Sequence, residues 1–344
     1  MKKDNHPSPP LFQKIAEIIE QARQTVAQTA NLAMLHTYFE IGRMIVEDEQ
    51  QGHARAAYGK QTLRELSERL TERFGKGFSV DNLQNMRQFY AIFSKYETLS
   101  RKFRLSWSHY LVLMRIQNPD ERSFYEIESA QNQWSLATLK RQYDSSLYER
   151  LALSRDKEAV KKLAAKGQTI EKPADILKNP LTLDFLGLDD RHAYSESDLE
   201  NAILSKIQQF LLELGKGFAF IGRQVRFTFE EEHFKVDLVF YNRLLRCFVV
   251  IDLKLGKITH KDLGQMQMYV NHYDRNVKVP DEHPTIGILL CKQKNDAVVK
   301  LTLPEDANIY ASEYQLYLPD KQLLQQKLKE WIDEIDQQII SENQ

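Results

Sequence analysis

The stretch FKVDLVFYNRLLRCFVVIDLKLGK, residues 234–257, decides the fold of this chain. It contains two runs rich in β-branched and aromatic residues, Phe234 to Tyr241 and Cys247 to Lys254, with a short polar connection between them. This pattern predicts an antiparallel hairpin of central strands. The run DLGQMQMYVNHYD, residues 262–274, follows with helical spacing, so a helix is expected to pack beside the hairpin.

Three charged residues, Asp237, Asp252 and Lys254, lie within these strands. Because side chains alternate along a strand, Asp252 and Lys254 project from the same face, and Asp237 can lie beside them on the neighbouring strand. Charges buried without partners are costly, so the cluster must be neutralised internally, by a ligand or by solvent at a cleft. The plainer alternative is a surface salt bridge at the end of a hairpin.

Two carboxylates and an ammonium in one cluster can carry out phosphate chemistry. Carboxylate oxygens bind hard divalent cations, and Mg²⁺ needs only one or two of them together with water and substrate phosphate. Asp237 and Asp252 are therefore candidate ligands for Mg²⁺ or Mn²⁺. The ammonium of Lys254 can orient or help to deprotonate the attacking water and offset charge that develops on the phosphate.

Asp237, the tripeptide Asp252-Leu253-Lys254, and Gln265 and Tyr269 on the next helix resemble the PD-(D/E)XK nuclease superfamily with a RecB-like Q-x-x-x-Y helix. The proline of the superfamily motif is absent, and Val236 takes its place. Gln265 and Tyr269 stand one helical turn apart, so both can face the same cleft, where they can hold a phosphate or orient the lysine. Their alternative role is a simple helix flank.

The chain from about Phe12 to Trp331 also resembles the YhcG family, through the stretches NLQNMRQFY, LSWSHY and VIDLKLGKITHKDLGQMQMYVN. The resemblance implies an all-α N-terminal domain, of helix-turn-helix or winged-helix-like type, and an α/β restriction-endonuclease-like domain whose mixed central sheet is flanked by helices. It further implies a Mg²⁺-dependent DNA nuclease, a hydrolase of phosphodiester bonds. By analogy this nuclease is an endonuclease in a restriction, defence or DNA-processing role.

Three segments are expected: a helical DNA-binding domain at 11–155, a linker at 156–190 and the nuclease domain at 191–344. In the first, a helix at 63–74 ends at the Gly75-Lys76-Gly77 turn, and Ser79 can cap a new helix from about Val80 to Phe93. Helix, short glycine turn and helix together form a helix-turn-helix pattern.

The second helix of this pattern and the segment after it carry most of the expected DNA contacts. Lys60 to Arg115 holds eleven Lys and Arg against five Asp and Glu. The expected contacts are with base edges or phosphates, and the side chains are Asn82, Asn85, Arg87, Gln88, Arg101, Lys102 and Arg104, with Lys257 in the second domain. The alternative is that the amides form an ordinary solvated helix face.

Glu200 lies on the first helix of the second domain, where relatives with this nuclease fold often place a glutamate near the metal. Ser197 and Glu200 also match a capping box, which would occupy the same carboxylate with a backbone N–H. The terminal helix, residues 321–340, has a wide apolar face that either packs on its own nuclease core or forms a homodimer.

Composition limits the remaining possibilities. The net charge is −1, so a nucleic-acid surface must be a local patch that is compensated elsewhere. The chain has neither an apolar leader nor a run of 18 apolar residues, which predicts a cytoplasmic protein without membrane association. Two further functions are a catalytically silent DNA-binding or assembly protein and a helical interaction adaptor attached to a nuclease. A silent protein would commonly lose one of the three charged residues, and all are present.

Overall fold

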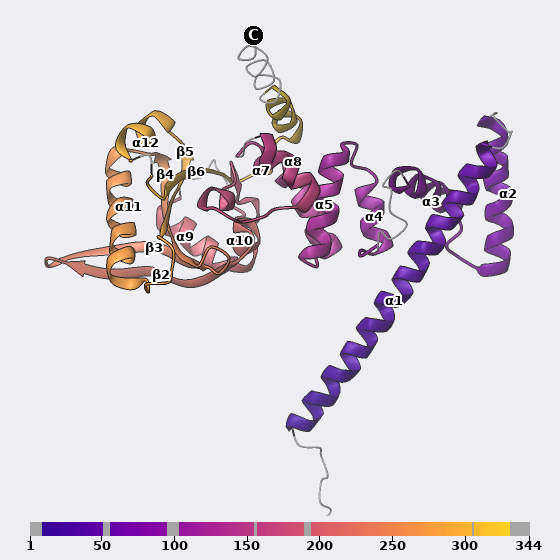
Figure 1. Cartoon of the computed structure of the whole chain (residues 1–344), viewed down its shortest axis with the longest axis horizontal. Helices are drawn as coiled ribbons and strands as arrows, with labels where there is room; N and C mark the ends of the chain where they lie inside the picture. Colours follow the sequence, from indigo (N-terminus) through magenta and orange to yellow (C-terminus); the bar gives the residue numbers. More distant parts are fainter. Residues whose placement is uncertain are drawn as a thin grey trace, which may run out of the picture. The chain divides into compact units, whose positions relative to one another are not determined.

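The computed structural model describes residues 9–50, 56–94, 103–154, 157–188, 194–304 and 306–330. The chain forms two compact units (Figure 1). Unit 1 comprises residues 1–122 and 126–139, and unit 2 comprises residues 123–125 and 140–344. The segment predicted as a linker, 156–190, lies wholly in unit 2.

Unit 1 is helical. Its helices are α1 (Pro9–Gln50), α2 (Ala56–Phe74), α3 (Val80–Phe93), α4 (Trp107–Leu113) and most of α5 (Pro119–Gln131). The first helix is a single unbroken element of 42 residues. Ser79 caps α3 as predicted, since its side chain accepts a hydrogen bond from the Asn82 N–H at 3.3 Å. Among the described residues from 9 to 180 none lies in a strand, so an all-α unit is confirmed and no wing is found there.

The core of unit 1 forms where α3 packs against α1 and α2. Leu83, Met86 and Phe89 of α3 are fully buried. Gly42 lets the two helix backbones approach closely, because a Cβ at this position would collide with the Met86 carbonyl oxygen. Aromatic rings from α1, α3, α4 and the segment before α4 pack around Phe89, with Phe103 at 5.0 Å and Tyr110 at 5.1 Å between centroids. This face of α3 is therefore committed to the core.

Unit 2 contains a six-stranded mixed sheet in the order β1-β6-β5-β4-β3-β2. The strands are β1 (Leu181–Thr182), β2 (Phe218–Phe229), β3 (Glu232–Asn242), β4 (Cys247–Lys257), β5 (Ile286–Gln293) and β6 (Ile309–Gln315). β2, β3 and β4 form the predicted antiparallel meander, and β4, β5, β6 and β1 are parallel neighbours. The predicted hairpin of central strands is thus confirmed.

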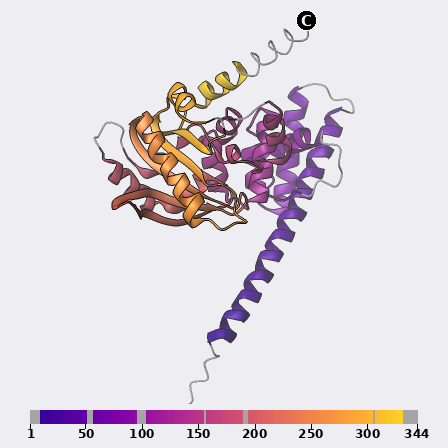
Figure 2. The ribbon, with the colours of Figure 1, turned by 60° about the vertical axis from the view of Figure 1, so that its left-hand side comes forward.

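Helices cover both faces of this sheet (Figure 2). On one face, α9 (Glu196–Ser205) and α10 (Ile207–Leu214) bury Leu238, Val249 and Ile251. On the other, α11 (His260–His272) buries Val236, Val239 and Val250. The π-helical turn η3 (Tyr273–Val277) and α12 (Asp296–Thr302) complete the fold. The alternation along β3 and β4 explains why both strands are apolar except at the charged positions.

The structure differs from the sequence pattern at three places between residues 135 and 214. The run of helical spacing through residues 197–214 is interrupted at Lys206, which separates α9 from α10. The helix expected over 135–151 is divided into α6 (Leu136–Asp144) and α7 (Leu147–Ala152) by Ser146, whose φ is 54°. The expected linker contains α8 (Lys157–Lys166) and the short 3₁₀ helices η1 (Pro173–Ile176) and η2 (Asp184–Leu186). It also supplies β1, which pairs with β6.

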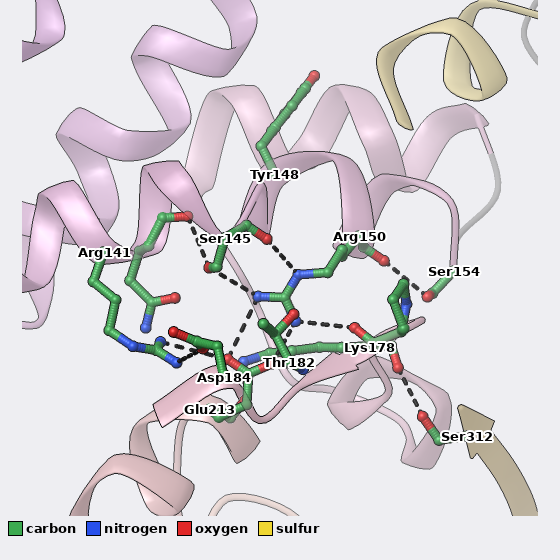
Figure 3. A network of polar contacts seen from close by, with 12 residues as sticks. Arg141, Ser145, Tyr148, Arg150, Ser154, Lys178, Thr182, Asp184, Glu213 and Ser312 are labelled. Atoms are coloured by element: carbon green, nitrogen blue, oxygen red, sulfur yellow. Dashed lines mark hydrogen bonds and ion pairs between the residues drawn. The ribbon is translucent and has the colours of Figure 1, made fainter. Parts of the chain in front are cut away.

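A buried ion pair joins α7 to α10 within unit 2 (Figure 3). Both side chains, Arg150 and Glu213, are fully buried, and the guanidinium donates to the carboxylate. Arg150 also donates to the Pro180 carbonyl at 3.0 Å, and Glu213 accepts from the Thr182 N–H at 2.9 Å. Burial alone would raise the pKa of Glu213, but Arg150 and Lys178 hold it below its usual value. The network fixes the start of β1 against the helices.

Candidate active site

The two central strands separate at one end, and the candidate residues lie at this fork. The β3–β4 ladder runs from Asn242 opposite Cys247 to Leu238 opposite Ile251. Beyond it, the Leu253 N–H donates to Asp237 Oδ2 at 2.9 Å. A side-chain carboxylate thus takes the place of a strand carbonyl, which holds Asp237 at the fork.

Asp252 and Lys254 form an ion pair on β4, with Lys254 Nζ 2.8 Å from Asp252 Oδ2. The Asp252 side chain is only 4% exposed and that of Lys254 is 18% exposed. Burial, and then the negative charge of Asp237, raise the pKa of Asp252 to about 7, although Lys254 opposes the rise. Burial lowers the pKa of Lys254, but the neighbouring carboxylates, Asp252 foremost, together outweigh burial, so the net change is upward.

Gln224 joins Glu200 to Asp237 and was not among the predicted site residues. Its amide nitrogen donates to Glu200 Oε2 at 2.7 Å and to Asp237 Oδ1 at 2.9 Å. Gln224 has a φ of 46°, in the left-handed region. The signal that could have found it is hairpin register: counted back from the EEEH turn, Gln224 stands opposite Asp237, between the pairs Arg223–Leu238 and Val225–Val236.

Glu200 belongs to this cluster and not to a helix cap. The capping box of α9 is formed by Ser195 and Asp198, whose carboxylate accepts from the Ser195 N–H at 2.8 Å. The Ser197–Glu200 box considered from the sequence is therefore wrong. The glutamate is largely buried, and this burial raises its pKa, while the hydrogen bond from Gln224 opposes the rise.

Gln265 and Tyr269 of α11 contact each other, as their spacing predicts. The Gln265 amide nitrogen donates to the Tyr269 hydroxyl, which in turn donates to the Lys235 carbonyl oxygen at 2.8 Å. Tyr269 is buried, and burial raises its pKa. The pair therefore fixes α11 to β3 two residues before Asp237, which positions the helix beside the fork.

The donor set at the fork fits a hard divalent cation. Its members are the carboxylate oxygens of Asp237 and Asp252 on two neighbouring strands, with the Lys254 ammonium 2.8 Å from Asp252 Oδ2. Within the described part of the chain, no three His, Cys, Asp or Glu side chains are gathered closely enough to form a complete protein-only metal site. Mg²⁺ does not need one, since one or two carboxylates with water and phosphate suffice. Asp237 and Asp252 are the residues that would hold it.

The structure gives several of the predicted nucleic-acid contacts a partner within unit 1. Trp107 Nε1 donates to Asn82 Oδ1 at 3.3 Å, Arg87 forms an ion pair with Glu49 at 2.8 Å, and Gln88 donates to the Met114 carbonyl at 3.4 Å. Asn85 is half-buried on the same helix. Of the remaining candidates, Arg104 and Lys257 are exposed, while Arg101 and Lys102 lie outside the described residues.

No described helix combines the length and the apolar character that crossing a membrane requires.

Comparison with known proteins identifies the family of this chain. Residues 174–329 match the model of the YhcG PDDEXK nuclease domain, and residues 14–150 match that of the DUF1016 N-terminal domain. The chain is 40% identical to an Escherichia coli K12 protein named "Putative nuclease YhcG", over 91% of this chain and 92% of that protein.

Two solved structures resemble part of this chain at low identity. A repair endonuclease from Pyrococcus abyssi is 19% identical with a TM-score of 0.25, and EndoMS in a complex with double-stranded DNA is 16% identical with a TM-score of 0.26. Each match covers 39% of this chain and half of the other chain. The family assignment rests on the matches that span the chain: this protein belongs to the YhcG family and carries a PDDEXK nuclease domain.

Proposed function

We propose that this protein is a metal-dependent nuclease that hydrolyses phosphodiester bonds in DNA. The observation that carries the proposal is the close association of Asp252 with Lys254 at 2.8 Å beside an Asp237 that the Leu253 N–H holds at the fork. All three charged groups are present and close together, which favours an active enzyme over a catalytically silent DNA-binding or assembly protein.

Each residue of the fork has a separate proposed role. Asp237 and Asp252 would hold Mg²⁺ or Mn²⁺, which when bound supplies Lewis acidity and lowers the pKa of water. Lys254 places its ammonium beside these carboxylates, where it can orient the attacking water and offset charge on the phosphate. Glu200 stands behind Gln224 as an additional carboxylate near the site. Gln265 acts through Tyr269, by fixing α11 to β3.

Unit 1 is proposed to bind nucleic acid. Exposed Arg104 and the polar side of α3 support this role, with contacts to phosphates or base edges. Because Asn82, Arg87 and Gln88 have partners inside the unit, a contact from any of these side chains requires it to exchange that partner for the DNA. Reading of bases by α3 is therefore less favourable than it would be if these side chains were free in solvent.

A cleavage screen with the full chain tests the proposal. Closed circular duplex DNA, linear duplex, single-stranded DNA and RNA are incubated with Mg²⁺, with Mn²⁺ and with EDTA. We expect cutting with either metal and none with EDTA. Nicking of closed circles would show endonuclease activity, since these substrates have no ends. Absence of cutting on every substrate with both metals would overturn the proposal.

A further inference from the structure

Beyond the fork, β2 and β3 continue together as a two-stranded arm, which we define as residues 224–237. The β2–β3 ladder extends to Phe229 opposite Glu232, whereas the β3–β4 ladder stops at Leu238. Figure 1 shows this hairpin reaching past the other strands of the sheet. The arm begins at Gln224 and Asp237, so it starts inside the candidate active site.

One face of the arm is apolar and packs against α11. Phe227 stacks on His272 with ring centroids 3.9 Å apart and an interplanar angle of 11°, and it also stacks on Phe234. The Tyr269 hydroxyl donates to the Lys235 carbonyl on the same stretch. These contacts fix the arm against α11. The opposite face of the arm is therefore held in a defined position.

The opposite face is cationic. Arg226 stands directly across from Lys235, and Thr228 stands across from His233, with Thr228 Oγ1 2.9 Å from His233 Nδ1. Arg226 and Lys235 are both exposed, and neither forms an ion pair with any carboxylate among the described residues. Like charges directly opposite each other destabilise a sheet, so this arrangement favours the binding of an external anion.

The cationic face lies next to the carboxylates of the fork. Lys235 is two residues from Asp237, roughly 7 Å along the strand, so a phosphate bound at Lys235 lies close to one held at the fork. The positive charge of Lys235, like that of Arg223, acts on Glu200 and lowers its pKa against the effect of burial. Arg223 itself donates to Asn201 on α9 at 3.1 Å.

We propose that Arg226 and Lys235 bind the phosphodiester backbone of the nucleic acid immediately beside the scissile phosphate. The inference rests on the proposed nuclease function and adds the surface that the substrate follows. The backbone runs from the fork along the cationic face of the arm toward Thr228 and His233. The contact is with phosphates, so it is independent of sequence.

The test uses the Arg226→Ala/Lys235→Ala double variant of the full chain, with Arg243→Ala as the control. Arg243 is exposed in the turn that follows β3, at the end of the strand opposite to the arm. Its replacement therefore removes one positive charge away from the proposed contact. Fluorescence anisotropy in EDTA measures binding to labelled duplex DNA, single-stranded DNA and RNA without cleavage. Titrations at several salt concentrations give the slope of log K against log salt.

For duplex DNA we expect the double variant to bind about 30-fold more weakly at 0.15 M salt. Its slope should be smaller by about 1.8, since each lost phosphate contact removes about 0.9. Arg243→Ala should stay within about 2-fold of the wild type, and Arg226→Lys should retain most of the affinity because the charge remains. A thermal midpoint of the double variant at or above that of the wild type would show that folding is intact.

A double variant with wild-type affinity and salt slope on every nucleic acid would overturn the arm proposal, even if the wild type cuts DNA. Weakened binding in a protein that cuts nothing would support the arm and contradict the nuclease function. Failure of the wild type to bind any of the three nucleic acids would overturn both.

Discussion

The carboxylate of Asp237 accepts a hydrogen bond from the Leu253 backbone N–H at 2.9 Å, across the point where β3 and β4 separate. Leu253 lies between Asp252 and Lys254, so one contact ties the first acidic residue to the backbone that carries the other two charged groups. The fork therefore fixes the relative positions of all three groups through main-chain geometry, before any ligand is bound.

Gln224 should hold Glu200 beside Asp237, because its amide donates to both carboxylates. We expect Gln224→Met, which keeps the volume and removes both donors, to destabilise the metal-free protein by about 1–3 kcal/mol. Glu200→Met leaves no acceptor oxygen and should remove one of the same bonds, so the double variant should lose less than the sum of the two single variants. Thermal unfolding in EDTA measures the stability of the wild type, both single variants and the double variant. Strictly additive losses of stability would show that the two residues act separately.

The buried Arg150–Glu213 pair should make the stability of unit 2 decrease at low pH. Glu213→Gln leaves Arg150 buried without its counter-charge, and the expected loss at pH 7 is about 3–5 kcal/mol. The pKa of Glu213 is lowered in the folded state, so its stabilisation is complete above the unfolded value of 4.5 and is lost as pH falls through the folded value.

The difference in free energy of unfolding between wild type and Glu213→Gln should therefore become smaller below pH 4.5. Circular dichroism melts of both proteins from pH 7 downward measure it. A difference that stays constant with pH would contradict the assigned role of the carboxylate.

Arg87 offers a direct check on DNA contact by α3. Its ion pair with Glu49 is half-exposed, so Arg87→Ala should cost at most about 1 kcal/mol of stability. If the side chain also contacts a base, binding should weaken by about 1–3 kcal/mol, and by less for a solvated phosphate contact. Filter binding compares the variant with wild type and with Arg104→Ala. Identical curves for Arg87→Ala and wild type would remove this side chain from the interface.

The terminal helix packs on its own chain over its described part, residues 321–330. Leu324 and Leu328 are buried, and Lys321 Nζ lies 3.4 Å from Glu149 Oε1. Leu323, predicted for the same face, is exposed, and the other apolar residues of that face, Trp331, Ile332 and Ile335, lie outside the described residues. We expect a chain ending at Pro319 to melt at a lower temperature and to keep the mass of a monomer, like the full chain. Light scattering that finds a dimer lost on truncation would instead support the homodimer.

The sheet and the three charged residues could be predicted because their signals are local. Strand alternation places Asp252 and Lys254 on one face whatever the rest of the fold does, and helical spacing brings Gln265 next to Tyr269. Gln224 could not be found in this way. Its role depends on the register of a second hairpin and on a left-handed φ at the residue itself.

Competing local signals explain the remaining errors. The sequence SESDLE contains two overlapping capping boxes; Ser195 and Asp198 form the box, while Glu200 accepts a hydrogen bond from Gln224. On α3, the amides looked solvated because their partners come from elsewhere in unit 1. Trp107, for example, is 25 residues from Asn82. Such contacts belong to tertiary packing, which residue spacing alone does not specify.

Asp252 and Lys254 are proposed to carry the cleavage chemistry, and single-turnover kinetics can test this assignment. Asp252→Asn and Lys254→Ala, purified as full chains, are compared with wild type in single-turnover cleavage with Mg²⁺ or Mn²⁺. Each lost group should cost at least about 3 kcal/mol of transition-state stabilisation, so cleavage should become undetectable or fall by two orders of magnitude or more. Nucleic-acid binding by Asp252→Asn should persist or tighten, because one carboxylate facing the phosphates is gone. Cleavage by Asp252→Asn at the wild-type rate would place the active site elsewhere and contradict the account.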